Sequence, residues 1–208
     1  MAVKRRVGIL ISGRGSGMMS LIRAAQSPDF PAEIAVVLAN RAEAGGLALA
    51  RAEGIAGRAV PQRDFGRDRA AHEAALIVAL EQEGVELVCL AGYMRLFTPL
   101  FVQRWAGRML NIHPSLLPAF PGVDTHARAL AAGVKLHGCT VHLVTEGMDE
   151  GPILAQAAVP VLAGDSEESL GARVLAQEHL LYPAALRRFV VGDGGEADPA
   201  AALRNPPG

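Results

Sequence analysis

The sequence predicts a single-domain α/β fold, with a mainly parallel twisted sheet and helices on both faces. Short apolar runs alternate with segments of helical periodicity along much of the chain, as expected of βαβ units. Half of the chain is hydrophobic but only 4% is aromatic, so Val, Leu, Ile and Ala supply the core, as in sheets buried on both faces. The length of 208 residues fits one domain of this class.

Strands and helices alternate over the first half of the chain. Short apolar runs predict the strands, and charged positions mixed with Ala and Leu at helical spacing predict the helices. The expected strands are residues 7–11, 34–39, 58–60 and 87–91. The expected helices are residues 18–25, 47–53 and 64–82, the last ended by Gly84.

Capping signals and prolines guide the prediction for the next segment. Thr98 followed by Pro99 is typical of an N-cap with proline at N1, so a helix is expected over residues 98–105. The apolar run 109–112 predicts a strand, which the following prolines end in a turning, exposed loop. A helix is then expected over residues 125–132, ended by Gly133.

The C-terminal part departs from the parallel pattern. Residues 140–145 and 153–161 are strand-like with a short connection, which predicts a local antiparallel pair. Residues 165–168 resemble a capping box before a last helix over 170–190. The composition then turns to Gly, Ala, Pro and Asp, so we expect one domain over 1–190 and a flexible tail over 191–208.

Composition excludes several classes of function. The net charge of −1 and the absence of a basic tract argue against a nucleic-acid partner. Cys89 and Cys139 lie in apolar runs and are expected to be buried thiols of a reducing compartment. No apolar stretch approaches membrane-spanning length, and the first apolar run is too short for a signal peptide. We therefore expect a cytoplasmic protein without a membrane partner.

A glycine-rich loop follows the first expected strand. Gly13, Gly15 and Gly17 stand between a strand and a helix, where backbone N–H groups can bind an anion. A dinucleotide fingerprint fails because Met18 replaces its third glycine and Asn40 replaces its acid, and no Gly-Lys-Ser/Thr of a P-loop occurs. The loop predicts a site for one phosphate, and the alternative is a tight turn without a ligand.

Three polar residues form a candidate catalytic centre. Asn111 and His113 are two residues apart, so strand alternation places both on one face, and Asp149 follows downstream. An amide can stabilise an oxyanion, an imidazole can move a proton, and a carboxylate can orient the imidazole. Each residue alone also fits a structural role, in a turn, in the core or on a solvated surface.

The other histidines do not predict a metal site. No His-x-His or Cys-x-x-Cys spacing occurs, and no Gly-x-Ser-x-Gly elbow indicates a serine nucleophile. His72 is expected on a solvated helix face, and His126 near a helix start. His137, His142 and His179 are expected to be core groups or to support the site. The residues themselves leave the reaction open.

The segment 111–122, reading NIHPSLLPAFPG, and the segment 147–152 closely resemble the phosphoribosylglycinamide formyltransferases, folate-dependent enzymes of purine biosynthesis. Residues 11–16, 90–95 and 177–179 share the resemblance, which extends from the first strand to about residue 190. It implies a Rossmann-like formyltransferase that transfers the formyl group of 10-formyltetrahydrofolate to the amine of glycinamide ribonucleotide. No metal is required.

The resemblance also implies roles for individual residues. Asn111 and His113 would face the formyl carbon and stabilise the oxyanion of a tetrahedral intermediate. Asp149 would favour the protonated form of His113 and assist proton movement from the amine to the leaving nitrogen. The residues implied for the ribosyl phosphate are Gly15, Ser16 and Gly17 at the phosphate and Glu178 at the ribose hydroxyls. Those implied for the folate are Arg69, Met94, Arg95, Leu96, Phe97, Asn111, Thr145, Glu146, Gly147, Met148 and Asp149.

Some features separate this chain from the family pattern. The family commonly has asparagine where Gly17 stands, so only backbone can act on the phosphate there. Asp124 stands where some members have histidine, and we assign it no role. For Arg95 a surface salt bridge is an equal alternative to a folate contact. The sequence does not predict an oligomeric state.

Rival functions share the same polar trio. Methionyl-tRNA formyltransferases carry a further C-terminal domain and formyltetrahydrofolate deformylases a further N-terminal one, and a chain of 208 residues is expected to have room for neither. A non-catalytic module that binds a sugar phosphate or a folate is the alternative of another class. It would bind its ligand without turnover.

Overall fold

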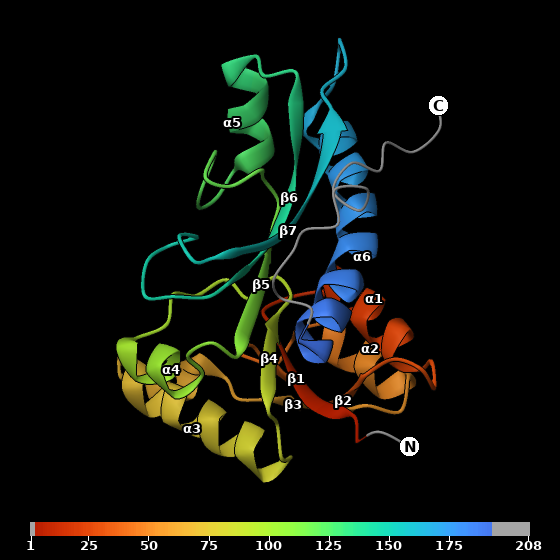
Figure 1. Cartoon of the computed structure of the whole chain (residues 1–208). Coiled ribbons are helices and arrows are strands. Elements are labelled where there is room, and N and C mark those ends of the chain that lie inside the picture. The colour runs from red at the N-terminus through yellow and green to blue at the C-terminus, as the bar shows by residue number, and fades with distance from the viewer. Residues whose placement is uncertain (1–2, 193–208) are drawn as a thin grey trace. The chain divides into compact units, whose positions relative to one another are not determined.

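The computed structural model describes residues 3–192 (Figure 1). The chain divides into two compact units, the first ending at Asn111 and the second beginning at Ile112. The division into a domain over residues 1–190 and a tail over 191–208 stays a prediction. Apart from Val191 and Gly192, that tail lies outside the described residues.

The first unit holds the parallel part of the sheet. Its strands are β1 (Arg5–Ile11), β2 (Ala32–Ala39), β3 (Ala56–Ala59), β4 (Leu87–Leu90) and β5 (Met109–His113), whose last two residues belong to the second unit. β1 pairs in parallel with β2 and with β4, β3 pairs with β2, and β5 pairs with β4. The order β3-β2-β1-β4-β5 changes direction between β1 and β4, the position where ligands bind in such sheets.

Helices cover both faces of this parallel sheet. They are α1 (Ser16–Ala25), α2 (Gly46–Ala52), α3 (Arg69–Gln82) and α4 (Pro99–Arg104). Figure 1 shows α1 and α2 on one side of the strands and α3 and α4 on the other. The strand interiors are therefore apolar on both faces, as at Ile9, Val37 and Val88, which are fully buried.

The second unit is built on an antiparallel pair. β6 (Leu136–Leu143) pairs with β7 (Ile153–Pro160), and β5, β6 and β7 follow one another in strand order. α6 (Glu167–Val191) packs against both strands, and α5 (Thr125–Ala132) packs against α6. Tyr182 and Leu186 of α6 are fully buried in this packing. The α/β class, the mainly parallel sheet and the antiparallel pair are thus confirmed.

One expected helix is in fact two elements. The segment 64–82 begins inside a short 3-10 helix, η1 (Gln62–Phe65), and continues into α3. Gly66 separates them with φ of +57°, a conformation outside the helical region. Asp68 then caps α3, because its carboxylate accepts a hydrogen bond from the N–H of Ala71 at 2.8 Å.

The capping box of the last helix lies one residue later than the sequence suggested. Ser166 is the N-cap, and it exchanges side-chain hydrogen bonds with Ser169 at N3. Asp165 instead accepts hydrogen bonds from the N–H of Leu162 and from Arg173. The Asp165 carboxylate is directed to Leu162 and Arg173 and not to a helix N–H, which the local sequence pattern does not reveal.

The positions of His72 and His179 correct what the sequence predicted for them. His72 is fully buried on α3, where its Nε2 lies 2.9 Å from the carbonyl oxygen of Val60. Burial lowers the pKa of this imidazole, and the carbonyl partly offsets the effect. His179 is exposed on α6, so its core alternative is wrong, and its supporting role stays a prediction.

No helix in residues 3–192 combines the length and the apolar character needed to cross a bilayer.

A substitution at Gly138 of β6 tests how closely β6 and β7 pack. A Cβ at this position would lie 2.0 Å from the carbonyl oxygen of Ala157 on β7, so the two strands would have to separate. We expect Gly138→Ala to lower the free energy of unfolding by about 3 kcal/mol, as measured by urea titration. Gly45→Ala is the matched control, because nothing lies within 4 Å of a Cβ there. Equal stabilities of the two variants would contradict this packing.

Candidate active site

Asn111 and His113 lie at the end of β5, as the sequence predicted. Asn111 pairs with Leu90 of β4, and it is half-buried. His113 is the last residue of the strand and is only 5% exposed. The alternation of a strand turns both side chains to the same face. β5 therefore fixes an amide and an imidazole side by side.

Asp149 lies next to His113, and this is the central contact of the site. Its Oδ2 is 3.4 Å from Nδ1 of His113 and accepts a hydrogen bond from the N–H of Gly122 at 2.8 Å. The other ring nitrogen, Nε2, lies 3.0 Å from the carbonyl oxygen of Phe120. Each ring nitrogen of His113 therefore faces a protein oxygen, which fixes the orientation of the ring.

The backbone of Asp149 has a strained conformation. Its φ is +56°, which a residue with a side chain seldom adopts. Glycines close the loop around it, since a Cβ on Gly151 would lie 1.7 Å from the carbonyl oxygen of Leu143. The N–H of Leu143 also donates to the carbonyl of Pro152 at 2.9 Å. The loop therefore holds the Asp149 carboxylate in a fixed position.

His142 is a second imidazole beside Asp149. Its Nε2 lies 3.7 Å from Oδ1 of Asp149, and its Nδ1 lies 2.9 Å from the carbonyl oxygen of Leu143. Burial lowers the pKa of His142, while the Leu143 carbonyl and Asp149 oppose this shift. The sequence left this residue between a core role and a supporting one, and the structure places it at the carboxylate.

The glycine loop leads directly into α1. Gly15 is the N-cap with φ of +62°, and Ser16 and Gly17 belong to the first helical turn. The helix therefore begins two residues earlier than expected. Its first N–H groups have no partner within the helix, the arrangement that suits an anion.

Two residues that hold this loop were missed by the sequence analysis. Gly46 donates its N–H to the carbonyl of Gly13 at 3.1 Å, and a Cβ there would lie 2.9 Å from the carbonyl oxygen of Arg14. The buried hydroxyl of Ser12 accepts the N–H of Met94 at 2.8 Å. The adjacent glycines 45 and 46 were the available signal for the first contact. The second joins segments far apart in sequence.

Side chains of α3 hold the segment after β4 that was assigned to the folate. Arg69 donates to the carbonyl of Leu96. One turn later, the buried carboxylate of Glu73 accepts the N–H of Thr98 at 2.9 Å. Thr98 is the N-cap of α4, as predicted, but its hydroxyl binds Glu73 rather than its own helix. Glu73 had no signal in the sequence.

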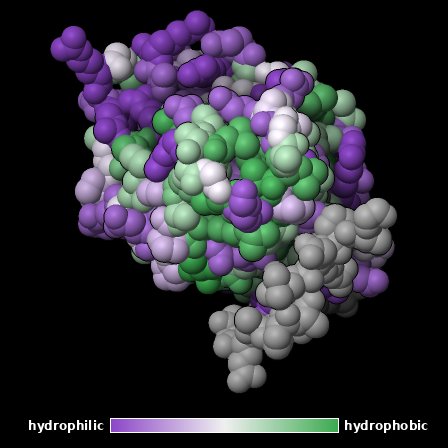
Figure 2. Space-filling view, turned by 90° about the horizontal axis from the view of Figure 1, so that it is seen from above, coloured by the Kyte–Doolittle hydropathy of each residue, from purple (hydrophilic) through white to green (hydrophobic). Residues whose placement is uncertain are grey.

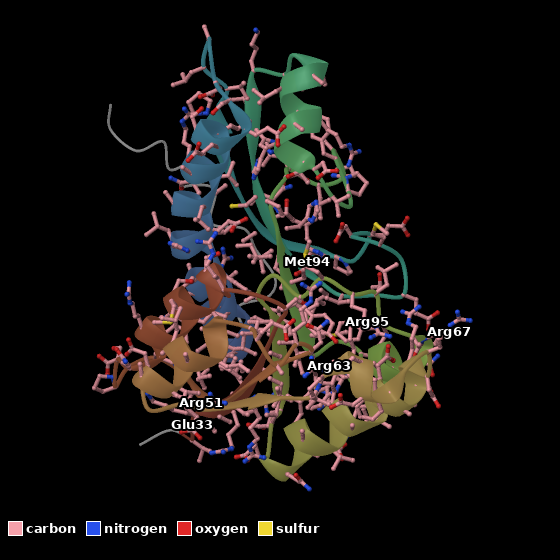
Figure 3. All side chains as sticks on the ribbon, turned by 180° about the vertical axis from the view of Figure 1, so that it is seen from behind. Glu33, Arg51, Arg63, Arg67, Met94 and Arg95 are labelled. Carbon is pink, nitrogen blue, oxygen red and sulfur yellow. The ribbon has the colours of Figure 1, made fainter. Side chains whose placement is uncertain are left out.

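Arg95 donates to Oε1 of Gln62 at 2.8 Å rather than to a carboxylate. Figure 3 shows Arg95 on the side of the first unit that carries Arg63 and Arg67. Met94 and Leu96 of the same segment are 67% and 57% exposed. Within this segment, exposed apolar side chains therefore alternate with a cation.

The corresponding segment of the second unit is also open to solvent. Thr145 and Glu146 are exposed, and Met148 is 48% exposed. Figure 2 shows apolar surface reaching the solvent on the face seen from above. Apolar surface beside polar main chain suits a planar heterocycle.

Two further residues were singled out in the sequence, Glu178 for the ribose and Asp124 without a role. Burial raises the pKa of Glu178 on α6 to about 7, so its carboxyl is held partly uncharged near neutrality. Asp124 is exposed with φ of +56°, and it stands at the N-cap of α5 without a side-chain capping bond. Within residues 3–192 no cluster of three or more His, Cys, Asp or Glu side chains could hold a metal ion.

The chain is similar to known proteins over most of its length. The family described as formyl transferase matches residues 5–186. The phosphoribosylglycinamide formyltransferase of Escherichia coli (strain K12) is 44% identical over 184 residues, which cover 88% of this chain and 86% of that protein. The crystal structure of phosphoribosylglycinamide formyltransferase from Brucella melitensis is 60% identical, with a TM-score of 0.87, over 91% of this chain and 97% of that one.

Some relatives are much longer. The human trifunctional purine biosynthetic protein adenosine-3 is 44% identical over 189 residues, which cover 91% of this chain. The matched region is only 19% of that protein, so the chain spans about a fifth of its length.

Glu178→Gln tests the burial of this carboxyl. The folded chain keeps the proton up to a pKa of about 7, while the ordinary value is 4.5, so between these values the folded state binds more protons than the unfolded state. Stability therefore falls as the pH rises through this window. We expect the free energy of unfolding of the parent to fall relative to that of Glu178→Gln from pH 4.5 to 7.

Urea titrations at several pH values measure this difference. Glu43→Gln, at an exposed loop position, is the control for loss of one carboxylate. Parallel curves for the parent and Glu178→Gln across the window would show that the buried carboxyl is not the cause.

Proposed function

Because the chain belongs to the formyl transferase family, we propose that it transfers the formyl group of 10-formyltetrahydrofolate to the amine of 5-phosphoribosylglycinamide. The products are the N-formyl ribonucleotide and tetrahydrofolate, a step of purine biosynthesis. The contact between His113 and Asp149 is the observation that carries the proposal, because it supplies charge and proton transfer beside the Asn111 amide.

Asn111 and His113 act on the carbonyl under attack. The amine adds to the formyl carbon, and negative charge develops on its oxygen. The Asn111 amide donates a hydrogen bond to this oxyanion. Since both nitrogens of His113 already face protein oxygens, its contribution is the positive charge of the imidazolium. A donor such as the Asn111 amide lowers the free energy of the transition state by about 3–4 kcal/mol.

Asp149 serves as the proton carrier. The amine must lose a proton as its bond to carbon forms, and the leaving nitrogen of the folate must gain one. A carboxylate beside His113 can accept the first proton and return it, directly or through a water. The hydrogen bond from Gly122 keeps Oδ2 of the carboxylate oriented during both transfers.

The remaining predicted residues bind the substrates. The N–H groups at Gly15, Ser16 and Gly17 would hold the phosphate at the start of α1. Glu178 would accept hydrogen bonds from the ribose hydroxyls, which favour its charged form. Met94–Phe97 and Thr145–Asp149 would receive the pterin through exposed apolar side chains and main chain.

The arginines of the folate segment have separate roles. Arg69 holds the Leu96 carbonyl and orients the segment, whereas Arg95 would meet the carboxylates of the folate. Cys89 and Cys139 are buried thiols, which would suit a reducing cytoplasm.

Loss of 10-formyltetrahydrofolate, followed by absorbance with purified protein, tests the reaction. We expect consumption only when glycinamide ribonucleotide is present. Consumption without the ribonucleotide would make water the acceptor and favour a deformylase. Binding of both ligands without turnover would indicate a binding module and would refute the transferase.

Asp149→Asn tests the proton carrier. The amide keeps the size of the side chain but cannot accept and return a proton, so we expect kcat to fall by about 10³-fold or more. Circular dichroism and thermal unfolding verify that the variant is folded. Glu150→Gln, the exposed neighbouring carboxylate, is the matched control and should retain its rate. A folded Asp149→Asn enzyme with a near-normal rate would refute the role of Asp149.

A further inference from the structure

The loop that follows His113 supplies two main-chain groups to the catalytic pair. The Phe120 carbonyl lies 3.0 Å from Nε2 of His113. The Gly122 N–H donates to Oδ2 of Asp149 at 2.8 Å. The orientation of both side chains therefore depends on where the backbone of residues 114–122 lies.

A buried hydroxyl on β6 fixes the first part of this loop. The Oγ1 of Thr140 donates to the carbonyl of Ser115 at 2.7 Å and accepts the N–H of Leu117 at 3.0 Å. It also accepts a hydrogen bond from Nε2 of Gln156 at 3.0 Å, and Gln156 donates to the Leu117 carbonyl at 2.8 Å. Thr140 is fully buried, and one donated bond and two accepted ones use its whole capacity.

Ser115 connects Thr140 to the part of the loop that contacts His113. Its carbonyl is held by Thr140, and its own hydroxyl, fully buried, donates to the carbonyl of Ala119 at 2.6 Å. Ala119 immediately precedes Phe120, whose carbonyl meets His113. An unbroken series of hydrogen bonds and one peptide unit thus leads from β6 to the imidazole.

We propose that the Thr140 hydroxyl is a positioning group for formyl transfer, which holds His113 and Asp149 in place through Ser115 and the backbone at Phe120 and Gly122. The proposal rests on the proposed function, because it assigns the pair a reaction to be positioned for. Neither hydroxyl touches a reacting atom. Their effect is to keep the His113 imidazole and the Asp149 carboxylate correctly oriented, because small displacements of catalytic groups slow the reaction.

Three variants of β6 test the inference. Thr140→Val keeps the shape and removes all three hydrogen bonds, and Thr140→Ser restores the hydroxyl. Val141→Ala is the matched control, because the neighbouring residue is fully buried and strand alternation turns it to the other face. It reports the effect of lost packing without a change at the loop.

We expect Thr140→Val to lower kcat about tenfold to hundredfold, with KM for both substrates within about threefold of the parent. Thr140→Ser should restore kcat to within about threefold, and Val141→Ala should leave both kcat and KM unchanged.

Two results would overturn the inference. One is a folded Thr140→Val enzyme with the parent's kcat, and the other is an equal loss of kcat in Val141→Ala. If Thr140→Val does not fold, Ser115→Ala removes the next link and must show the same split between kcat and KM. A parent chain that transfers no formyl group would refute the proposed function itself.

Discussion

The candidate site depends on the contacts that the Asp149 carboxylate makes. One oxygen receives both the Gly122 N–H and the His113 imidazole, and the other lies near a second imidazole, His142. A strained backbone and closely packed glycines fix this carboxylate from its own loop. The Gly122 N–H and the two nearby imidazoles give this partly buried carboxylate polar neighbours on both of its oxygens.

Much of the fold could be predicted from local patterns. Each of β1, β2 and β4 contains an apolar run that marks it as a strand, and α5 has the expected bounds because Gly133 ends it with a left-handed conformation. The errors lie where long-range contacts override local signals. Asp165 is bound by Arg173, so Ser166 caps α6, and His72 finds a carbonyl inside the first unit instead of solvent.

The candidate site shows the same division. The sequence identified Asn111, His113 and Asp149 because amide, imidazole and carboxylate groups can act in catalysis. The motifs around them also resemble those of a known family. It could not identify Thr140, Glu73 or Ser12, whose ordinary side chains act through main-chain atoms distant in sequence. Their importance comes from burial and from complete use of their hydrogen-bonding groups, which only the folded chain reveals.

A crystal structure with glycinamide ribonucleotide and a stable analogue of 10-formyltetrahydrofolate tests the central claim most directly. The account predicts the phosphate on the N–H groups of Gly15 to Gly17. It predicts the carbonyl oxygen of the analogue at the Asn111 amide, with Asp149 still in contact with His113. A bound ribonucleotide amine remote from Asn111 and His113, or an Asp149 carboxylate turned away from the imidazole, would contradict it.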